Sequence, residues 1–280
     1  MKRYSFLRFP NFLDKAVTLS YDDAVIWDER LIKTMQKYGL KGTFNVNSAF
    51  FGYNERHLTK EQAIELYTKS NNEVAIHGEY HYSHAELDKT MALNDILMDR
   101  KNLEQMFGKQ IRGMAYANGS CSDEVIEILK MCGVKYARTA LSTGGFDIPN
   151  DWYKIQPTCH HNYPQLMEYA HKFIESPKSR NFWYNSPKLF YLWGHSYEFN
   201  DKDNWQVFEE FAEYIGNRED VWYATNIEIY EYIEDYNRLV FSADGQRVYN
   251  PTNRTLYFNN DYTTEENVIS VAPGQTVEVN

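Results

Sequence analysis

The stretch KAVTLS, residues 15–20, is an apolar and β-branched run that sets the pattern for most of the chain. A helical pattern follows at residues 26–38, with Leu31, Ile32 and Met35 on one face and Gly39 as its stop, and a second apolar run follows at 42–47. A strand, a helix and a second strand in this order predict two parallel strands with the helix packed against the sheet.

The same alternation continues along the chain. Further strand-like runs lie at residues 73–76, 111–116, 134–137, 153–155, 189–193 and 221–224. Helical patterns begin after Thr59, where Gln62 completes a capping box, and then at residues 91–107, 123–131, 165–174, 205–215 and 227–236. This number of strand–helix units favours an α/β fold in the form of a closed or nearly closed barrel.

The pattern changes after Leu239, where short alternating runs are separated by turn-forming pairs such as Asp244-Gly245 and Pro273-Gly274. We therefore expect a barrel domain over residues 1–238. A small all-β appendage over residues 239–280 is expected to pack against it, since it is too small to fold alone.

Composition narrows the class of protein. The chain has 280 residues, 43% hydrophobic and 24% charged, with a net charge of −10. An acidic chain of this kind is a poor partner for nucleic acid, and it contains no run of about 18 apolar residues that would span a membrane. Three scattered cysteines and an N-terminus without an apolar signal segment indicate a cytoplasmic protein, while the oligomeric state is left open.

Polar residues follow several of the expected strands directly. They are Asp22 and Asp23 after the first strand, His77 and His81 after the third, Tyr116 after the 111–116 strand, and His195 after the 189–193 strand. The carboxyl ends of parallel strands form the active face of such folds, so we expect these side chains to meet at one rim.

His77 and His81, with one aspartate of the pair Asp22-Asp23, form a set that suits a catalytic metal. Two imidazoles and one carboxylate leave open positions on zinc, cobalt or nickel, and a bound divalent metal lowers the pKa of water toward ~7. The other aspartate of the pair is then available as a general base, and a histidine across the pocket could act as a general acid.

These residues resemble the motifs of the polysaccharide deacetylase family, also called the NodB-homology or family 4 carbohydrate esterases. Residues 20–24 (SYDDA) resemble its first motif, residues 77–81 its second, Asp151-Trp152 its fourth and residues 192–195 (LWGH) its fifth. The resemblance implies a distorted (β/α)7-type barrel, with Asp22 as base, Asp23, His77 and His81 as metal ligands, and His195 as acid. It also implies that Trp152 lines the pocket and that Asp151 tunes His195.

The third motif departs from the family pattern. Residues 115–119 (AYANG) lack the arginine that pairs with the base, and Arg112 lies too early on its strand to replace it. The backbone near Tyr116 remains a candidate oxyanion donor. Secondary candidates for a place in the pocket are His160, His161, Tyr197 and Glu198.

The expected function is removal of an acyl group, N-acetyl first, from a carbohydrate amide, with one divalent metal and most readily Zn. Two alternatives stay open. One is hydrolysis of small cyclic amides or ureides on the same fold, which the absence of both a secretion signal and the third-motif arginine favours. The other is a non-catalytic carbohydrate-binding protein that keeps the fold.

Overall fold

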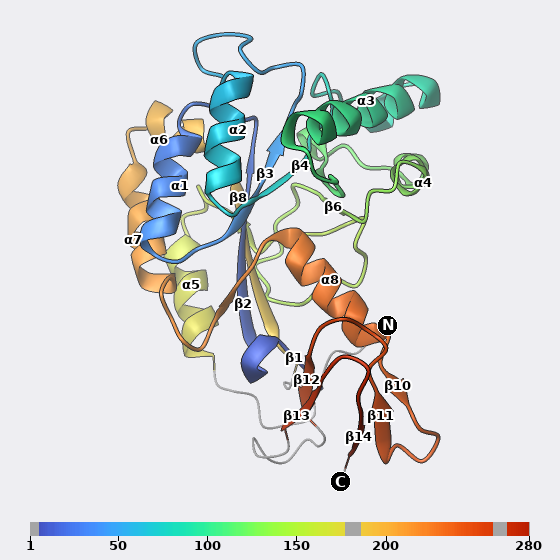
Figure 1. Cartoon of the computed structure of the whole chain (residues 1–280). Helices are drawn as coiled ribbons and strands as arrows, with labels where there is room; N and C mark the ends of the chain where they lie inside the picture. The colour runs from blue at the N-terminus through green and yellow to red at the C-terminus, as the bar shows by residue number, and fades with distance from the viewer. Residues whose placement is uncertain (1–5, 177–185, 260–267, 280) are drawn as a thin grey trace.

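A parallel β-sheet with helices around it forms the centre of the molecule (Figure 1). The computed structural model describes residues 6–176, 186–259 and 268–279. In the sheet, the strands are hydrogen-bonded in the order β6-β5-β4-β3-β2-β8-β7, and β9 pairs with Ala16 and Val17 of β2 on the edge opposite β8. The expected α/β fold is confirmed.

The strands of this sheet match the sequence expectation except for β7. Their bounds are β2 Lys15–Asp22, β3 Gly42–Val46, β4 Glu73–Ile76, β5 Gly113–Ala115, β6 Tyr136–Arg138, β7 Cys159–His160, β8 Lys188–Gly194 and β9 Trp222–Tyr223. Every residue of β2 is buried, and it pairs in parallel with β3 and β8. Burial on both faces is the reason why this strand reads as a nearly continuous apolar run.

The sheet curls into the shape of a barrel. In the strand order, β5, β4 and β3 lie between β6 and β2, yet Arg138 of β6 contacts Asp22 of β2. A bridge between Arg138 and Ile155 extends the β6 edge toward the segment that leads into β7. This curvature brings the carboxyl ends of distant strands together, as the distorted (β/α)7-type barrel requires.

The helices follow the expected pattern closely. They are α1 Asp28–Lys37, α2 Lys60–Lys69, α3 Lys89–Phe107, α4 Asp123–Met131, α5 Leu166–Glu175, α6 Ser196–Asp201, α7 Trp205–Ile215 and α8 Asn226–Asn237. The capping box of Thr59 and Gln62 is present at the start of α2. None of the helices that the structure describes is both long and apolar enough to cross a bilayer.

Three short segments differ from the sequence expectation. Residues 153–155 form no strand and contribute only the bridge through Ile155. The two-residue strand β7 and the six-residue helix α6 were not expected. Both are too short for a period of apolar residues to show in the sequence.

The β-structure after α8 forms two small antiparallel sheets (Figure 1). One contains β10 Val240–Phe241, β11 Arg247–Tyr249 and β14 Thr276–Glu278, and the other contains β1 Leu7–Arg8, β12 Leu256–Asn259 and β13 Val268–Val271. Because β1 pairs with β12, a strand from the start of the chain joins the β-structure that follows α8. The division into domains at residue 239 stays a prediction.

Candidate active site

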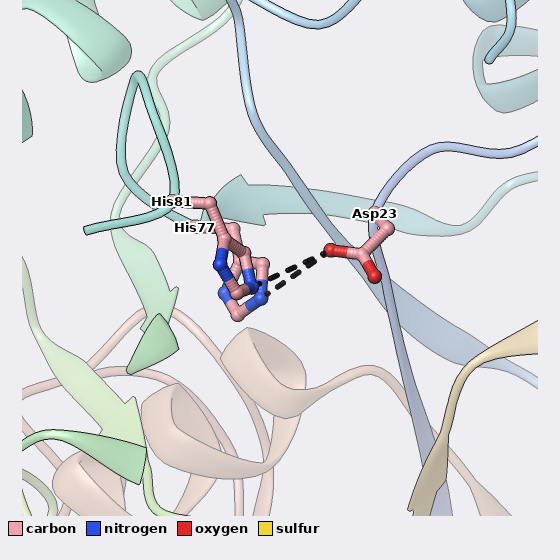
Figure 2. Close-up of side chains that lie close together, drawn as sticks. All are labelled: Asp23, His77 and His81. Carbon is pink, nitrogen blue, oxygen red and sulfur yellow. Dashed lines mark ion pairs between the residues drawn. The ribbon is translucent and has the colours of Figure 1, made fainter. Parts of the chain in front are cut away.

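Asp23, His77 and His81 meet at the carboxyl ends of neighbouring strands, as expected. Asp23 directly follows β2, and His77 directly follows β4. The Oδ1 atom of Asp23 lies 3.7 Å from Nε2 of His77 and 3.7 Å from Nε2 of His81. Figure 2 shows the carboxylate facing both imidazoles. The three candidate ligand atoms lie within 4.8 Å of one another, close enough to share one ion.

The hydrogen bond of the His77 ring leaves its Nε2 atom free to bind a metal. Its Nδ1 lies 2.8 Å from the backbone oxygen of Ala115, which can only accept a hydrogen bond. Nδ1 therefore carries the proton and Nε2 keeps its lone pair, directed toward Asp23. A carbonyl that fixes the ring and its tautomer in this way is the usual support of a metal-binding histidine.

Two of the three candidate ligands have an unusual backbone. Asp23 has a φ of 84° and His81 a φ of 58°, in the left-handed region that non-glycine residues rarely adopt. Such conformations cost about 1–3 kcal/mol each and persist only where the surroundings hold them.

Two carboxylates of α3 hold the segment that carries the histidines. Asp99 accepts hydrogen bonds from the backbone N–H groups of Ser48 and His77. Asp95 accepts from the N–H groups of Glu79 and Tyr80 and pairs with Nε2 of His84 at 2.8 Å. His84 thus has a structural role, and α3 fixes the loop between the two candidate metal ligands.

Asp22 has a buried arginine partner that the sequence motifs did not indicate. The Nη2 atom of Arg138 lies 2.6 and 2.5 Å from the two carboxylate oxygens of Asp22, and both side chains are almost fully buried. Burial alone would raise the pKa of Asp22, but the charge of Arg138, assisted by His77 and His195, lowers it to about 2. The guanidinium also lies over the Trp193 ring, 4.5 Å from its centroid.

His195 lies between the aspartate pair and Glu198. Its Nε2 is 3.9 Å from Oδ2 of Asp22 and 4.0 Å from Oδ2 of Asp23, while its Nδ1 is 2.7 Å from Oε1 of Glu198. Burial lowers the pKa of His195, but the hydrogen bond to Glu198 and the nearby carboxylates outweigh it and raise the pKa above its usual value.

The structure does not bring Asp151 and Trp152 to His195. Asp151 is exposed and accepts a hydrogen bond from the backbone N–H of Tyr153, and Glu198 contacts His195 instead. The Trp152 ring packs against Tyr230 of α8, with ring centroids 5.2 Å apart.

Tyr116 is likewise engaged elsewhere. Its backbone N–H donates to the carbonyl of Arg138 at 3.0 Å, and its hydroxyl donates to the carbonyl of Tyr153 at 2.9 Å. The N–H of Tyr116 is therefore already bonded and is not free to donate to an oxyanion.

One protein-family model matches the first half of the chain. Residues 10–137 match the family model for polysaccharide deacetylase. A comparison with curated protein sequences gave no match.

Three solved structures with the same fold are described as proteins of different function. A putative polysaccharide deacetylase from Mycobacterium smegmatis is 16% identical, with a TM-score of 0.62, and the match covers 85% of this chain and 96% of that one. The Puue allantoinase is 11% identical, with a TM-score of 0.59 and coverage of 82% and 93%. A CE4 family pseudoenzyme from Bacillus anthracis is 15% identical, with a TM-score of 0.51, and the chain covers 66% of its length.

At these identities the neighbours show the fold, whereas the family model matches the segment that carries Asp22, Asp23, His77 and His81. Residues 10–137 of this chain are thus similar to the polysaccharide deacetylase family.

Proposed function

We propose that this protein is a metal-dependent hydrolase that removes an acyl group, N-acetyl first, from an amide nitrogen of a carbohydrate. The observation that carries the proposal is the convergence of Asp22 and His195 on the Asp23, His77 and His81 group, with the nearest atoms of His195 and the aspartates about 4 Å apart.

Asp23, His77 and His81 would hold the metal. Their two imidazole nitrogens and one carboxylate suit zinc, with cobalt or nickel as alternatives, and leave positions open for substrate. A divalent metal supplies Lewis-acid activation of water and of the acyl oxygen.

Asp22 is suited to act as the general base. With a pKa of about 2 its carboxylate is ionised at neutral pH, and the Arg138 contact fixes its orientation. It accepts the proton of the attacking water, and its depressed pKa makes it a weak base that depends on close positioning.

His195 is suited to act as the general acid. Its raised pKa keeps it protonated at a higher pH than an ordinary histidine, and Nε2 faces the same space as Asp22. It donates the Nε2 proton to the leaving amine, so that the two residues begin the reaction in opposite protonation states.

The acyl-amide substrate is inferred from the family and from its solved members. One of these is a family 4 carbohydrate esterase from Streptomyces lividans in complex with acetate, which has a TM-score of 0.51. Acetate release from N-acetylated oligosaccharides is therefore the first activity to assay.

The proposal is tested by comparing the wild type with Asp22→Asn after loading with zinc, cobalt or nickel. We expect acetate release by the wild type and a loss of about 10²-fold or more in Asp22→Asn, with metal content unchanged. Asp147→Asn, at an exposed position, serves as the matched control. Full activity in Asp22→Asn would show that the base is another group.

A second candidate is hydrolysis of a small cyclic amide or ureide. The similarity in fold to an allantoinase over 82% of this chain favours including such compounds in the substrate panel. Binding of sugars with no turnover of any panel member would instead indicate a non-catalytic protein, and a protein of the same fold from Bacillus anthracis is described as a pseudoenzyme.

A further inference from the structure

Glu198, one helical turn after His195, is surrounded by hydrogen-bond donors and imidazoles. His195 Nδ1 and His160 Nε2 approach its Oε1 at 2.7 and 3.3 Å. Around Oε2 lie Nε2 of His161 at 3.5 Å, Nζ of Lys202 at 3.3 Å, and the side-chain amide of Asn162 as a hydrogen-bond donor. These partners come from β7, the turn after it and the two residues that flank α6.

The same cluster has the dimensions of a metal site. The candidate ligand atoms of His160, His161 and Glu198 lie within 4.8 Å of one another. Two ligands bound at about 2.1 Å to one tetrahedral zinc are about 3.4 Å apart, which is close to the 3.3 and 3.5 Å separations found here. Distances alone therefore do not distinguish a second metal site from a hydrogen-bonded cluster.

The position of the proton on His160 distinguishes them. The backbone N–H of Asn162 donates to Nδ1 of His160 at 3.1 Å, so Nδ1 carries the lone pair and Nε2 carries the proton. A protonated Nε2 cannot bind a metal, but it can donate to Glu198. His77 has the opposite arrangement, with Nδ1 against a carbonyl and Nε2 free.

His161 contributes packing rather than charge. Burial lowers its pKa to about 4, so the ring is neutral at neutral pH. The ring packs 4.0 Å from that of Phe199, and a Cβ atom on Gly194 would come within 2.1 Å of Nδ1. Only glycine at position 194 allows His161 to lie against the backbone that leads into His195.

We propose that Glu198 is the positioning residue of His195, held by His160, Asn162 and Lys202, and that this cluster binds no metal. Glu198 accepts the Nδ1 proton of His195, which leaves Nε2 facing Asp22 and Asp23 as the atom that exchanges protons with substrate. The catalytic part of this inference rests on the proposed function, whereas the hydrogen bond and the metal stoichiometry do not.

The test compares Glu198→Gln with Glu198→Asp, which keeps the charge, and with Glu210→Gln, an exposed control on α7. We expect Glu198→Gln to lower kcat by about 10²-fold while KM changes less than about twofold, since a general acid contributes 10²- to 10⁴-fold. Glu198→Asp should recover part of this loss, and Glu210→Gln should match the wild type. Unchanged kcat in Glu198→Gln would overturn the proposal.

Two readouts do not depend on turnover. A low-field proton resonance from the His195 Nδ1–H should be present in the wild type, absent in His195→Gln, and shifted or lost in Glu198→Gln. Zinc titration should saturate at one equivalent per chain in both the wild type and His160→Ala. If the wild type releases no acetate but the resonance depends on Glu198, the proposed function fails and the positioning holds. A second equivalent of zinc that His160→Ala removes would overturn the hydrogen-bonded interpretation.

Discussion

Arg138 of β6 and Asp22 of β2 form a buried ion pair across the curled sheet, with Nη2 of the arginine 2.5 Å from Oδ2 of the aspartate. In the strand register, Arg138 is the partner of Ala115, the residue that stands where the third family motif has its arginine. The cation thus reaches Asp22 from β6, at the same level of the barrel as Ala115 of the neighbouring strand β5.

Arg138→Met should both destabilise the fold and impair catalysis. It leaves a buried carboxylate without its partner, which costs about 3–5 kcal/mol in the free energy of unfolding, and it leaves burial free to raise the pKa of Asp22. Urea unfolding and kcat measure the two effects. The exchange Arg138→Ala with Ala115→Arg should recover part of both, because paired residues of parallel strands point to the same face. A single Arg138→Met variant as stable and active as the wild type would contradict the assignment.

Asp95→Ala should weaken metal binding although Asp95 is not itself one of the candidate metal ligands. The Asp95 carboxylate holds the backbone of Glu79 and Tyr80, just before His81, and losses of such supports lower metal affinity by about 10- to 100-fold. Asp88→Ala is the matched control on the same helix, since Asp88 only caps the N-terminus of α3 through the N–H of Thr90. The control should lose about 1 kcal/mol of stability while keeping its metal affinity. Equal metal affinities in the two variants would contradict this role of α3.

The buried carboxyl group of Glu73 should make the difference in stability between the wild type and Glu73→Gln depend on pH. Burial raises its pKa to about 7, although Ile227 N–H, Thr43 and Tyr136 donate hydrogen bonds to it. The pKa of Glu73 is higher in the folded state than in the unfolded one. The stability that protonated Glu73 contributes is therefore full below about pH 4.5 and is lost as the pH rises through about 7. Glu73→Gln should therefore gain stability relative to the wild type over this window, by roughly 2–4 kcal/mol at pH 8.

Urea unfolding of the wild type and Glu73→Gln at pH 4.5 and pH 8 measures this difference. Taking the difference between the two proteins cancels the contribution of Asp28, whose pKa burial also raises to about 7. A constant difference at both pH values would show that Glu73 ionises normally in the folded protein.

Asp151→Ala should have little effect on catalysis. The side chain is exposed, and within the described residues its one hydrogen bond is accepted from the Tyr153 N–H, so kcat should stay within about twofold of the wild type. Measuring kcat of Asp151→Ala and of Glu198→Gln in the same assay compares the roles of the two carboxylates. A large loss in Asp151→Ala would restore the role that the fourth-motif resemblance assigned to it.

The fold and the grouping of Asp23, His77 and His81 were predictable because their sequence signals are local. Long apolar runs and helical periods gave the strands and helices, and Asp23, His77 and His81 directly follow or lie close to strand ends. The supports of the site were not predictable in the same way. Arg138 is far from Asp22 in sequence, and only the curl of the sheet brings them together.

Glu198 is a second residue whose contact in the site could not be predicted from the sequence. It was visible as a polar residue near His195, but its contact with Nδ1 depends on the short helix α6, which has no periodic signal. His160 comes from the two-residue strand β7, which the sequence also does not reveal. A motif therefore indicates where chemistry occurs more reliably than which residues position it.

The central claim is that Asp23, His77 and His81 hold one divalent metal. The most direct measurement is the zinc content of the purified protein after dialysis against excess zinc and then against metal-free buffer, compared with that of His81→Ala and His171→Ala. We predict one equivalent in the wild type and in His171→Ala, an exposed control on α5, and less than a tenth of an equivalent, roughly, in His81→Ala. No bound zinc, cobalt or nickel in the wild type, or equal zinc in all three proteins, would contradict the account.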